Sequence, residues 1–440
     1  MTLRSGQSIF ASGVVSLLIK VIGAILSYAM IVAFAHLLSA DDYGRFALGL
    51  NGAIIIAALV GWGFNTGVMR YWPQQVVAHN PALAKGTIEL GYLITFLSST
   101  LLLVLAVLLS SYLSNAFDLG SPSYIITVFF LGGMIAFADF STNLLRAQGS
   151  TLASMLPRDV FWRLATPAIA YLLSRQTMAL DSTQSLAISA LVLAVLNIWQ
   201  GTWIGFNVNA FAGLIKAERN FRSLVPSLLP LWAAAIVYAM IQQFDVVIVG
   251  SLLSKADAGS YFAAQKTAQL LSLVLIAGGL ATAPHMSALY HAGKLVELQS
   301  LCRKLAIAIA GVTLAGFVFL IFAGKLLLSF FDPQFVAAYP ILIAIALGTV
   351  VDAVSGPNAY LMQMTKFEGA YLKTLVSCYA LVIAAQLILI PRFGSLGAAL
   401  ASACGIVTWN FLAIFILRQK AGLDPSLLAI ILPPRHANKI

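Results

Sequence analysis

Long uninterrupted apolar runs are the feature that most constrains what this chain can fold into. Apolar residues make up 60% of its 440 residues, and charged residues only 9%, against about 25% in soluble domains. A run of about 20 apolar residues crosses the hydrocarbon core of a bilayer as one helix. The composition therefore excludes a soluble enzyme. The length of the runs also excludes an outer-membrane barrel, whose strands alternate over about ten residues.

Twelve apolar windows can be placed along the chain, and we expect each to form a transmembrane helix. Together they leave room only for short loops, which argues against an extramembrane catalytic domain. The predicted windows are 13–36, 46–69, 86–111, 123–146, 160–175, 183–206, 228–250, 259–284, 304–326, 338–362, 371–390 and 395–418.

The basic residues predict the orientation of these helices. The chain carries 25 Lys and Arg against 15 Asp and Glu, a formal net charge of +10. Twelve spans place both termini on one side, and Lys and Arg gather in the loops of that side. By the positive-inside rule that side is cytoplasmic, so the excess charge indicates topology and not nucleic-acid binding. The basic residues in the opposite loops are Arg45, Arg175, Lys255, Lys325 and Arg392.

The two halves of the chain resemble each other. Residues 37–46 read LLSADDYGRF and residues 252–261 read LLSKADAGSY, 215 positions later without a gap. Asn143 and Asn358 stand at the same separation. Six helices per repeat is an even number, so both halves insert in the same orientation. Parallel repeats are related by an axis along the membrane normal, an arrangement that supports alternating access around a central site.

These patterns predict an all-α integral membrane protein with twelve transmembrane helices in two six-helix lobes around a central cavity. In the join between the lobes, Lys216, Arg219 and Arg222 recur at intervals of three, which favours an amphipathic helix on the membrane surface. Tethering the lobes and sensing anionic lipid are both open roles for it. The predicted segments are an N-terminal lobe over 1–206, a cytoplasmic amphipathic linker over 207–227, a C-terminal lobe over 228–418 and a cytoplasmic tail over 419–440.

Three short motifs carry a resemblance to a known family. They are the turn at 37–46, QFDVVIVG at 243–250 and PHMSALY at 284–290. With the twelve-helix count, these segments resemble polysaccharide flippases of the multidrug/oligosaccharidyl-lipid/polysaccharide exporter superfamily, over about residues 8 to 420. The resemblance implies a multi-pass protein of the bacterial inner membrane. Such a protein moves an undecaprenyl-diphosphate-linked oligosaccharide, such as an O-antigen unit of lipopolysaccharide or an exopolysaccharide unit, to the periplasmic leaflet.

Polar residues inside the apolar windows are the candidate substrate-cavity residues. An ionisable group at the bilayer centre costs about 2.5–3.5 kcal/mol on insertion scales and calls for a partner or a cavity. Asp245 and Lys266 fall in the outer half of neighbouring windows, where we expect an ion pair. Two interpretations stay open: a static pair that holds the hairpin, and a cavity pair that opens when a proton or an anionic substrate arrives.

A second polar group is predicted in the cytoplasmic half. Lys20 either snorkels to the head groups or faces the cavity, where it would meet the diphosphate of the carrier. Asp139, Asn143 and Arg146 share one helical face, which lines either the cavity or a helix interface. The full set of cavity candidates is Lys20, Asn65, Arg70, Asp139, Asn143, Arg146, Gln242, Gln243, Asp245, Gln265, Lys266, Gln269, Asp352 and Asn358.

Two further sets of side chains, one basic and one aromatic, each have two possible roles. Arg70, Arg146, Arg158 and Arg163 either determine topology or form an electrostatic entrance for an anionic head group. Four tryptophans within or beside the apolar windows either anchor the helices at the membrane interface or stack on sugars. These tryptophans are Trp62, Trp72, Trp162 and Trp232.

The leading functional prediction is a lipid-linked oligosaccharide flippase that works by alternating access. A small-molecule or multidrug exporter is the alternative, although acids in an apolar cavity would suit it better than a basic inner rim. A membrane enzyme of polysaccharide assembly is disfavoured, because no sizeable outer loop gathers acids and histidines. We therefore predict no catalytic residues and no enzyme activity.

No cofactor is predicted. No phosphate-binding loop for ATP occurs, so Asp139, Asp245 and Asp352 become candidates for coupling to H+ or Na+. The three cysteines lack metal-binding spacing, and no metal site is predicted. The expected partners are a lipid-linked oligosaccharide, membrane lipids, and a polysaccharide polymerase and glycosyltransferases, with no nucleic acid.

Overall fold

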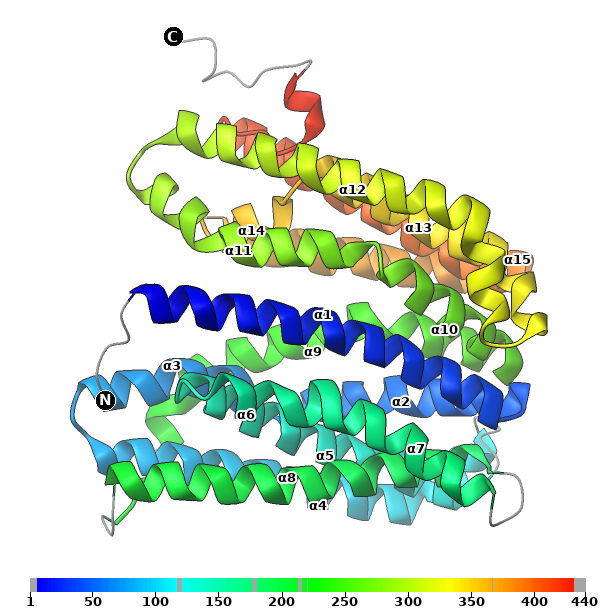
Figure 1. The fold of residues 1–440 in the computed structure, drawn as a ribbon, viewed down its shortest axis with the longest axis horizontal. Coiled ribbons are helices and arrows are strands. Elements are labelled where there is room, and N and C mark those ends of the chain that lie inside the picture. Colours follow the sequence, from blue (N-terminus) through cyan, green and yellow to red (C-terminus); the bar gives the residue numbers. More distant parts are fainter. Residues whose placement is uncertain are drawn as a thin grey trace. The chain divides into compact units, whose positions relative to one another are not determined.

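The computed structural model of the chain is built from helices (Figure 1). It describes residues 6–116, 121–175, 180–212, 216–219, 221–365 and 367–430, and these ranges contain no strand. Within them, nine helices are long and apolar enough to cross a membrane. The chain forms two compact units, Met1–Gly259 and Ser260–Ile440. The all-helical membrane fold is thus confirmed, while the count of twelve spans, the division into lobes and the central cavity stay predictions.

The first unit holds the N-terminal helices and ends within α10. Its elements are α1 (Gly6–Leu37), α2 (Ala40–Val60), α3 (Phe64–Val77), α4 (Pro81–Ala116), α5 (Pro122–Ala147), α6 (Thr151–Leu156), the π-helix η1 (Pro157–Phe161), α7 (Trp162–Ser174), α8 (Ser182–Ala212), α9 (Phe221–Leu252) and α10 (Lys255–Gln269). The second unit continues with α11 (Ser272–His291), α12 (Leu295–Ser329), the 3-10 helix η2 (Pro333–Ala338), α13 (Tyr339–Ser355), α14 (Asn358–Gln363), α15 (Glu368–Lys420) and the 3-10 helix η3 (Leu427–Ile430).

The predicted window 46–69 is not one helix, because the chain breaks between α2 and α3. Gly63 adopts a φ of 76°, and a Cβ there would lie 2.4 Å from the carbonyl oxygen of Leu228 on α9. Trp62 beside it also has a positive φ, 45°, which is unfavourable for a bulky residue. The Trp62 ring stacks on Trp232 of α9, with centroids 4.9 Å apart and planes 5° apart. The close approach of α9 therefore accounts for the break.

The join after α8 differs from the predicted amphipathic helix. Helix α8 continues to Ala212 and α9 begins at Phe221, while residues 216–219 are not helical. The Glu218 N–H donates to the carbonyl of Ala82 at 3.0 Å, so this segment uses its backbone to bind α4. The expected helix is thus wrong for the described residues 216–219.

A glycine on α4 makes room for this segment. A Cβ on Gly86 would lie 1.8 Å from the carbonyl oxygen of Glu218. Next to it, Arg219 donates to the Glu89 carboxylate from Nε at 3.0 Å and from Nη2 at 2.7 Å. The segment is therefore fixed to α4 by close backbone contact and an ion pair.

The repeated turns seen in the sequence have the same local structure. Ahead of α2, the Asp42 N–H donates to Ser39 Oγ at 3.2 Å, and the Ser39 hydroxyl donates to the Asp42 carboxylate at 2.9 Å. Ahead of α10, Asp257 and Ser254 make the corresponding bonds at 3.0 and 2.6 Å. Reciprocal bonds of this kind satisfy the free N–H groups at a helix start. The shared letters therefore encode two equivalent helix starts.

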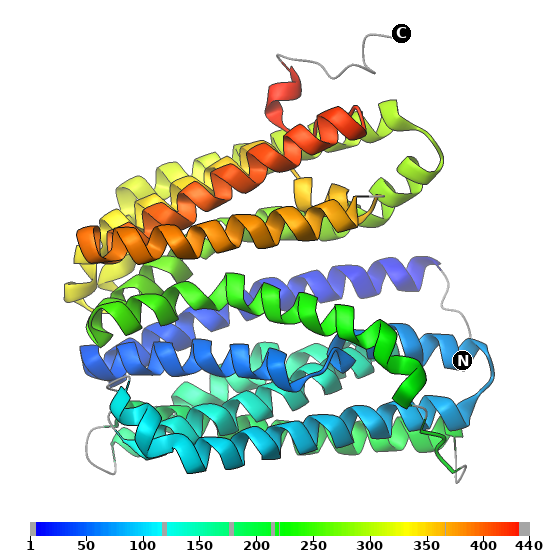
Figure 2. The ribbon, with the colours of Figure 1, turned by 180° about the vertical axis from the view of Figure 1, so that it is seen from behind.

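Helix α15 folds back on itself at Gly394. Its 53 residues would span about 80 Å at 1.5 Å per residue, far more than one membrane crossing. Gly394 has a φ of 60° and a ψ of −148°, and Figure 2 shows the two arms running side by side. A Cβ on Gly397 would lie 2.3 Å from the Leu389 carbonyl oxygen, so the arms touch closely at the turn. The arms coincide with the predicted windows 371–390 and 395–418.

After α15 the described chain packs against the second unit. The fully buried Asp424 side chain accepts hydrogen bonds from Arg418 Nε at 2.6 Å and from the Ser426 hydroxyl at 2.6 Å. Gln299 of α12 accepts a bond from the Asp424 N–H at 2.8 Å and donates to its carbonyl. Gly356, with a φ of 75°, leaves room for the Pro425 carbonyl. Part of the predicted tail thus caps this unit.

Candidate functional site

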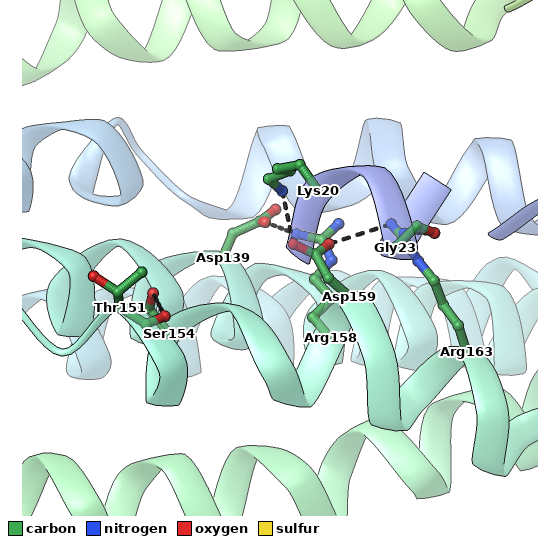
Figure 3. Close-up of polar contacts among 8 residues, drawn as sticks. All are labelled: Lys20, Gly23, Asp139, Thr151, Ser154, Arg158, Asp159 and Arg163. Atoms are coloured by element: carbon green, nitrogen blue, oxygen red, sulfur yellow. Dashed lines mark hydrogen bonds and ion pairs between the residues drawn. The ribbon is translucent and has the colours of Figure 1, made fainter. Parts of the chain in front are cut away.

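The candidate site is a cluster of charged side chains in the first unit, where α1, α5, η1 and α7 meet (Figure 3). Lys20 Nζ on α1 lies 2.8 Å from Asp159 Oδ2 on η1, and Arg163 Nη2 on α7 lies 3.3 Å from Asp159 Oδ1. Asp139 on α5 pairs with Arg158 on η1. Three basic and two acidic groups therefore meet, which leaves a surplus of positive charge. We call these five residues the charged cluster.

The π-helix that supplies two members of the charged cluster follows from a proline. Pro157 lacks an N–H, so it cannot bond the Ala153 carbonyl one turn earlier. That carbonyl instead accepts from Gln200 Nε2 of α8 at 3.1 Å. The Trp162 N–H reaches back five residues to the Pro157 carbonyl, which widens the turn. Such widened turns occur often at functional sites, and here the wide turn carries Arg158 and Asp159.

A glycine on α1 brings the charged cluster together. Arg163 donates a hydrogen bond to the Gly23 carbonyl, which ties α7 to α1. A Cβ on Gly23 would lie 2.8 Å from Arg163 Nη1 and 3.1 Å from the Asp159 carbonyl. Gly23 is therefore the residue that allows the charged groups of α1, η1 and α7 to touch.

Burial differs sharply within the charged cluster. The Asp159 side chain is 8% exposed, whereas that of Lys20 is 55% exposed. Arg163 is intermediate at 20%. The positive charges of Arg158 and Arg146 also act on Lys20. The anion therefore lies inside, and the ammonium of Lys20 presents the surplus positive charge outward.

The predicted polar face of α5 is only partly turned toward the charged cluster. Asp139 and Asn143 are half-buried and Arg146 is exposed. Asn143 Nδ2 donates to the Asn65 carbonyl on α3 at 2.9 Å, so Asn143 belongs to a helix interface. The Asn65 side-chain oxygen is buried and finds no hydrogen-bond partner among the described residues. Arg70, also on α3, is exposed.

The predicted residues of α9 lie in the same unit. Asp245 is buried, and Gln242 Nε2 donates to the Tyr238 hydroxyl at 3.1 Å. The Gln243 side-chain oxygen is buried and has no hydrogen-bond partner among the described residues. Helix α9 therefore carries several polar side chains within a predicted membrane-spanning window.

On α10, Lys266 Nζ donates to Gln269 Oε1 at 3.1 Å and lies 5.2 Å from the centroid of the Phe262 ring. Gln265 is buried, and its side-chain oxygen has no partner within the described chain. Lys266 belongs to the second unit and Asp245 to the first. Their expected ion pair therefore stays a prediction.

In the second unit, two predicted residues meet through a third that the sequence analysis missed. Asn410 Nδ2 donates to Asp352 Oδ1 at 2.8 Å, and Asn358 Nδ2 donates to Asn410 Oδ1 at 2.9 Å. Asn410 and Asn358 are buried and Asp352 is half-buried. In the sequence, Asn410 could have been noticed as a single side-chain amide inside the apolar window 395–418.

Asp159 is another residue of the candidate site that was not predicted from the sequence. It lies just outside the predicted window 160–175 and is not among the predicted cavity residues. The basic residues beside it, Arg158 and Arg163, were interpreted as topology determinants or as an electrostatic entrance. In the structure both are paired with acids, Arg158 with Asp139 and Arg163 with Asp159. The signal available was the dense alternation of charge at 158–163 beside an apolar run.

The helical fold and its candidate spans define a multi-pass membrane protein, and the charged cluster lies between its helices. A family model described as polysaccharide biosynthesis protein matches residues 9–290, and the chain belongs to that family. Among curated protein sequences, none matches this chain.

Several solved structures have a fold similar to that of this chain. An inward-facing multidrug resistance MATE family transporter of the MOP superfamily is 12% identical with a TM-score of 0.72, covering 96% of each chain. The lipid II flippase MurJ is 14% identical with a TM-score of 0.69, covering 92% of this chain and 87% of its own. A MOP superfamily transporter from Pyrococcus furiosus is 13% identical with a TM-score of 0.60, covering 92% and 95%. These comparisons show that the chain shares its fold with these solved structures.

Proposed function

We propose that this protein is a flippase that moves an undecaprenyl-diphosphate-linked oligosaccharide from the cytoplasmic to the periplasmic leaflet of the bacterial inner membrane. The oligosaccharide is a repeat unit for O-antigen, and hence lipopolysaccharide, or for exopolysaccharide. Both termini lie in the cytoplasm, as the distribution of Lys and Arg favours. The cycle is alternating access, in which the polyprenyl tail stays in lipid while the polar head group passes between the lobes.

The observation that carries this proposal is the charged cluster, in a chain of a polysaccharide biosynthesis family. A diphosphate and its sugars cannot cross hydrocarbon without replacement of their water shell. Cationic side chains form short, charge-assisted hydrogen bonds to phosphate oxygens. Lys20 is half-exposed and belongs to a cluster with surplus positive charge, so it is the side chain we assign to the diphosphate.

The energy source is proposed to be a proton or sodium gradient. Asp139, Asp245 and Asp352 are the candidate coupling residues, because acids in apolar surroundings bind a cation when their partners move away. Asp139 is paired with Arg158, and Asp352 accepts from Asn410. Movement that separates either contact would expose a carboxylate for the ion.

Multidrug export is the second candidate function. It is favoured by the similarity in fold to the MATE family transporter. A cationic drug requires a carboxylate that is not already neutralised, whereas both acids of the charged cluster have basic partners. The flippase therefore fits the local charge better. A polysaccharide polymerase and glycosyltransferases are the proposed functional partners.

Deletion of the gene in its native host tests the proposal. We expect loss of a surface glycan and accumulation of its lipid-linked repeat unit on the cytoplasmic side, measured in lipid extracts. The wild-type gene should restore the glycan, and Lys20→Ala at equal protein level should not. Normal glycan together with altered drug sensitivity would exclude the flippase and support the exporter.

A further inference from the structure

Asp159 already occupies the position of an anionic ligand. Its carboxylate receives Lys20 Nζ at 2.8 Å on one oxygen and Arg163 Nη2 at 3.3 Å on the other. The side chain is 8% exposed, while that of Lys20 is 55% exposed. An incoming anion can therefore reach the Lys20 ammonium from the exposed side. The Asp159 carboxylate, which binds the same ammonium, lies on the buried side.

Lys20 is the exchangeable partner of this carboxylate. Removing the only cation beside a buried carboxylate leaves an uncompensated charge, which is strongly destabilising. Arg163 prevents that outcome, because it stays bound to Asp159 and is also held by the Gly23 carbonyl. Lys20 can thus leave Asp159 without isolating it. Arg158 has its own partner, Asp139, and does not compete for the same oxygens.

We infer that Asp159 is a specificity-determining residue, an internal competitor that sets the minimum negative charge a head group must carry to engage Lys20. This inference rests on the proposed function. A phospholipid with a single negative charge offers Lys20 no more than Asp159 does, and Asp159 is tethered at high effective concentration. A diphosphate diester carries a charge on each phosphate. It can bind Lys20 and also gain from Arg146, an exposed cation whose charge already acts on Lys20.

The advantage of such a competitor comes from the surroundings of the protein. Anionic phospholipids are abundant in the same leaflet and present phosphate to the same cations. Specificity is a difference between two affinities and can be achieved by penalising the wrong ligand. Asp159 penalises a monoanion, which has only Lys20 to bind, more than a diphosphate diester, which can also bind Arg146.

The test is a selectivity ratio measured on the purified full-length chain in phosphatidylcholine nanodiscs. Two probes are titrated separately and bound states are counted by native mass spectrometry. They are farnesyl-diphosphate-linked N-acetylglucosamine, a diphosphate diester, and phosphatidylglycerol, a monoanion. Wild-type protein is expected to prefer the diester. Asp159→Asn is expected to bind phosphatidylglycerol more tightly, so that the ratio of the two dissociation constants falls about tenfold.

Matched variants separate the role in selectivity from a structural role. Asp159→Glu keeps the carboxylate and is expected to restore the wild-type ratio. Lys20→Gln leaves the Asp159–Arg163 pair in place and is expected to lower affinity for the diester about tenfold, so it serves as the test if Asp159→Asn does not fold. Lys294→Gln removes a cation of an exposed ion pair outside the charged cluster and is expected to leave the ratio unchanged.

The outcomes distinguish the inference from the proposed function. A wild-type preference for the diester that is unchanged in Asp159→Asn overturns the inference and leaves the flippase proposal standing. An unchanged affinity for the diester in Lys20→Gln contradicts the assignment of Lys20 to the diphosphate and the inference that rests on it. No preference in the wild-type protein overturns both. A preference that Asp159→Asn reduces and Asp159→Glu retains supports the inference.

Discussion

Gly44 and Gly259 lie against each other: a Cβ on Gly259 would stand 3.2 Å from the Cα of Gly44. The two glycines occupy equivalent positions of the sequence repeat, 215 residues apart. The first turns of α2 and α10 therefore touch at equivalent positions of the repeat. Small residues permit this approach, because a side chain at either position would separate the backbones. Equivalent residues of the two sequence repeats are thus in direct contact.

Gly44→Ala is expected to destabilise this crossing. Its Cβ would lie 1.7 Å from the Lys255 carbonyl oxygen, which is backbone and cannot rotate away. Overpacking of this kind costs roughly 1–3 kcal/mol, so the melting temperature in detergent should fall by several degrees. Gly52→Ala is the control, since its nearest neighbour would be at an ordinary 3.7 Å. Equal melting temperatures for the two variants would contradict the close contact.

Gly86→Ala is expected to detach residues 216–219 from α4. The added methyl would collide with the Glu218 carbonyl and disturb the Arg219–Glu89 ion pair. We expect the free energy of local opening to fall by about 1.4 kcal/mol, which makes the open state about ten times more populated. Trypsin should then cut after Lys216 or Arg219 about ten times faster. Gly201→Ala meets no atom within 4 Å and should leave the cleavage rate unchanged. A wild-type cleavage rate in Gly86→Ala would argue against this docking.

Asp424→Ala is expected to loosen the cap on the second unit. Its fully buried carboxylate satisfies Arg418 and the Ser426 hydroxyl, and its loss strands these donors. Arg418 is partly exposed, but the Ser426 hydroxyl is buried. Leaving a buried donor unsatisfied costs roughly 1–3 kcal/mol, measurable as a lower melting temperature. Glu297→Ala breaks the exposed Lys294–Glu297 pair and should cost at most about 1 kcal/mol. Equal decreases in melting temperature for Asp424→Ala and Glu297→Ala would contradict this prediction.

Asn410 is expected to couple Asp352 to Asn358. Asn410→Leu removes the donor to Asp352 and the acceptor for Asn358, so each partner loses a bond. Asp352→Asn alone and Asn410→Leu alone should each lower the melting temperature. The double variant should be less destabilised than the sum, with a coupling of roughly 0.5–3 kcal/mol. Strict additivity would show that these side chains do not form one network.

Features that depend on local sequence were predictable. Long apolar windows specify helices because hydrophobic length and intrahelical hydrogen bonding are properties of neighbouring residues. The helical period also predicted that Asp139, Asn143 and Arg146 share one face of α5, and none of the three is fully buried.

Features that depend on distant residues were not predictable. The break at Gly63 depends on the approach of Leu228 from α9, and no nearby residue signals it. Likewise Lys20 and Asp159 are 139 residues apart, and a sequence gives charge without giving its partner. Asp159 could not be recognised, because an acid at the edge of an apolar window looks the same in the sequence whether it faces water or a lysine on another helix.

The turn at Gly394 has a consequence for biogenesis. The arms of α15 join without an intervening loop, so a polar segment long enough to pass separately across the bilayer is lacking. Leaving one arm in the translocon while the other enters lipid would strand the backbone groups of the turn in hydrocarbon. The two arms are therefore expected to leave the translocon together as a preformed helical hairpin.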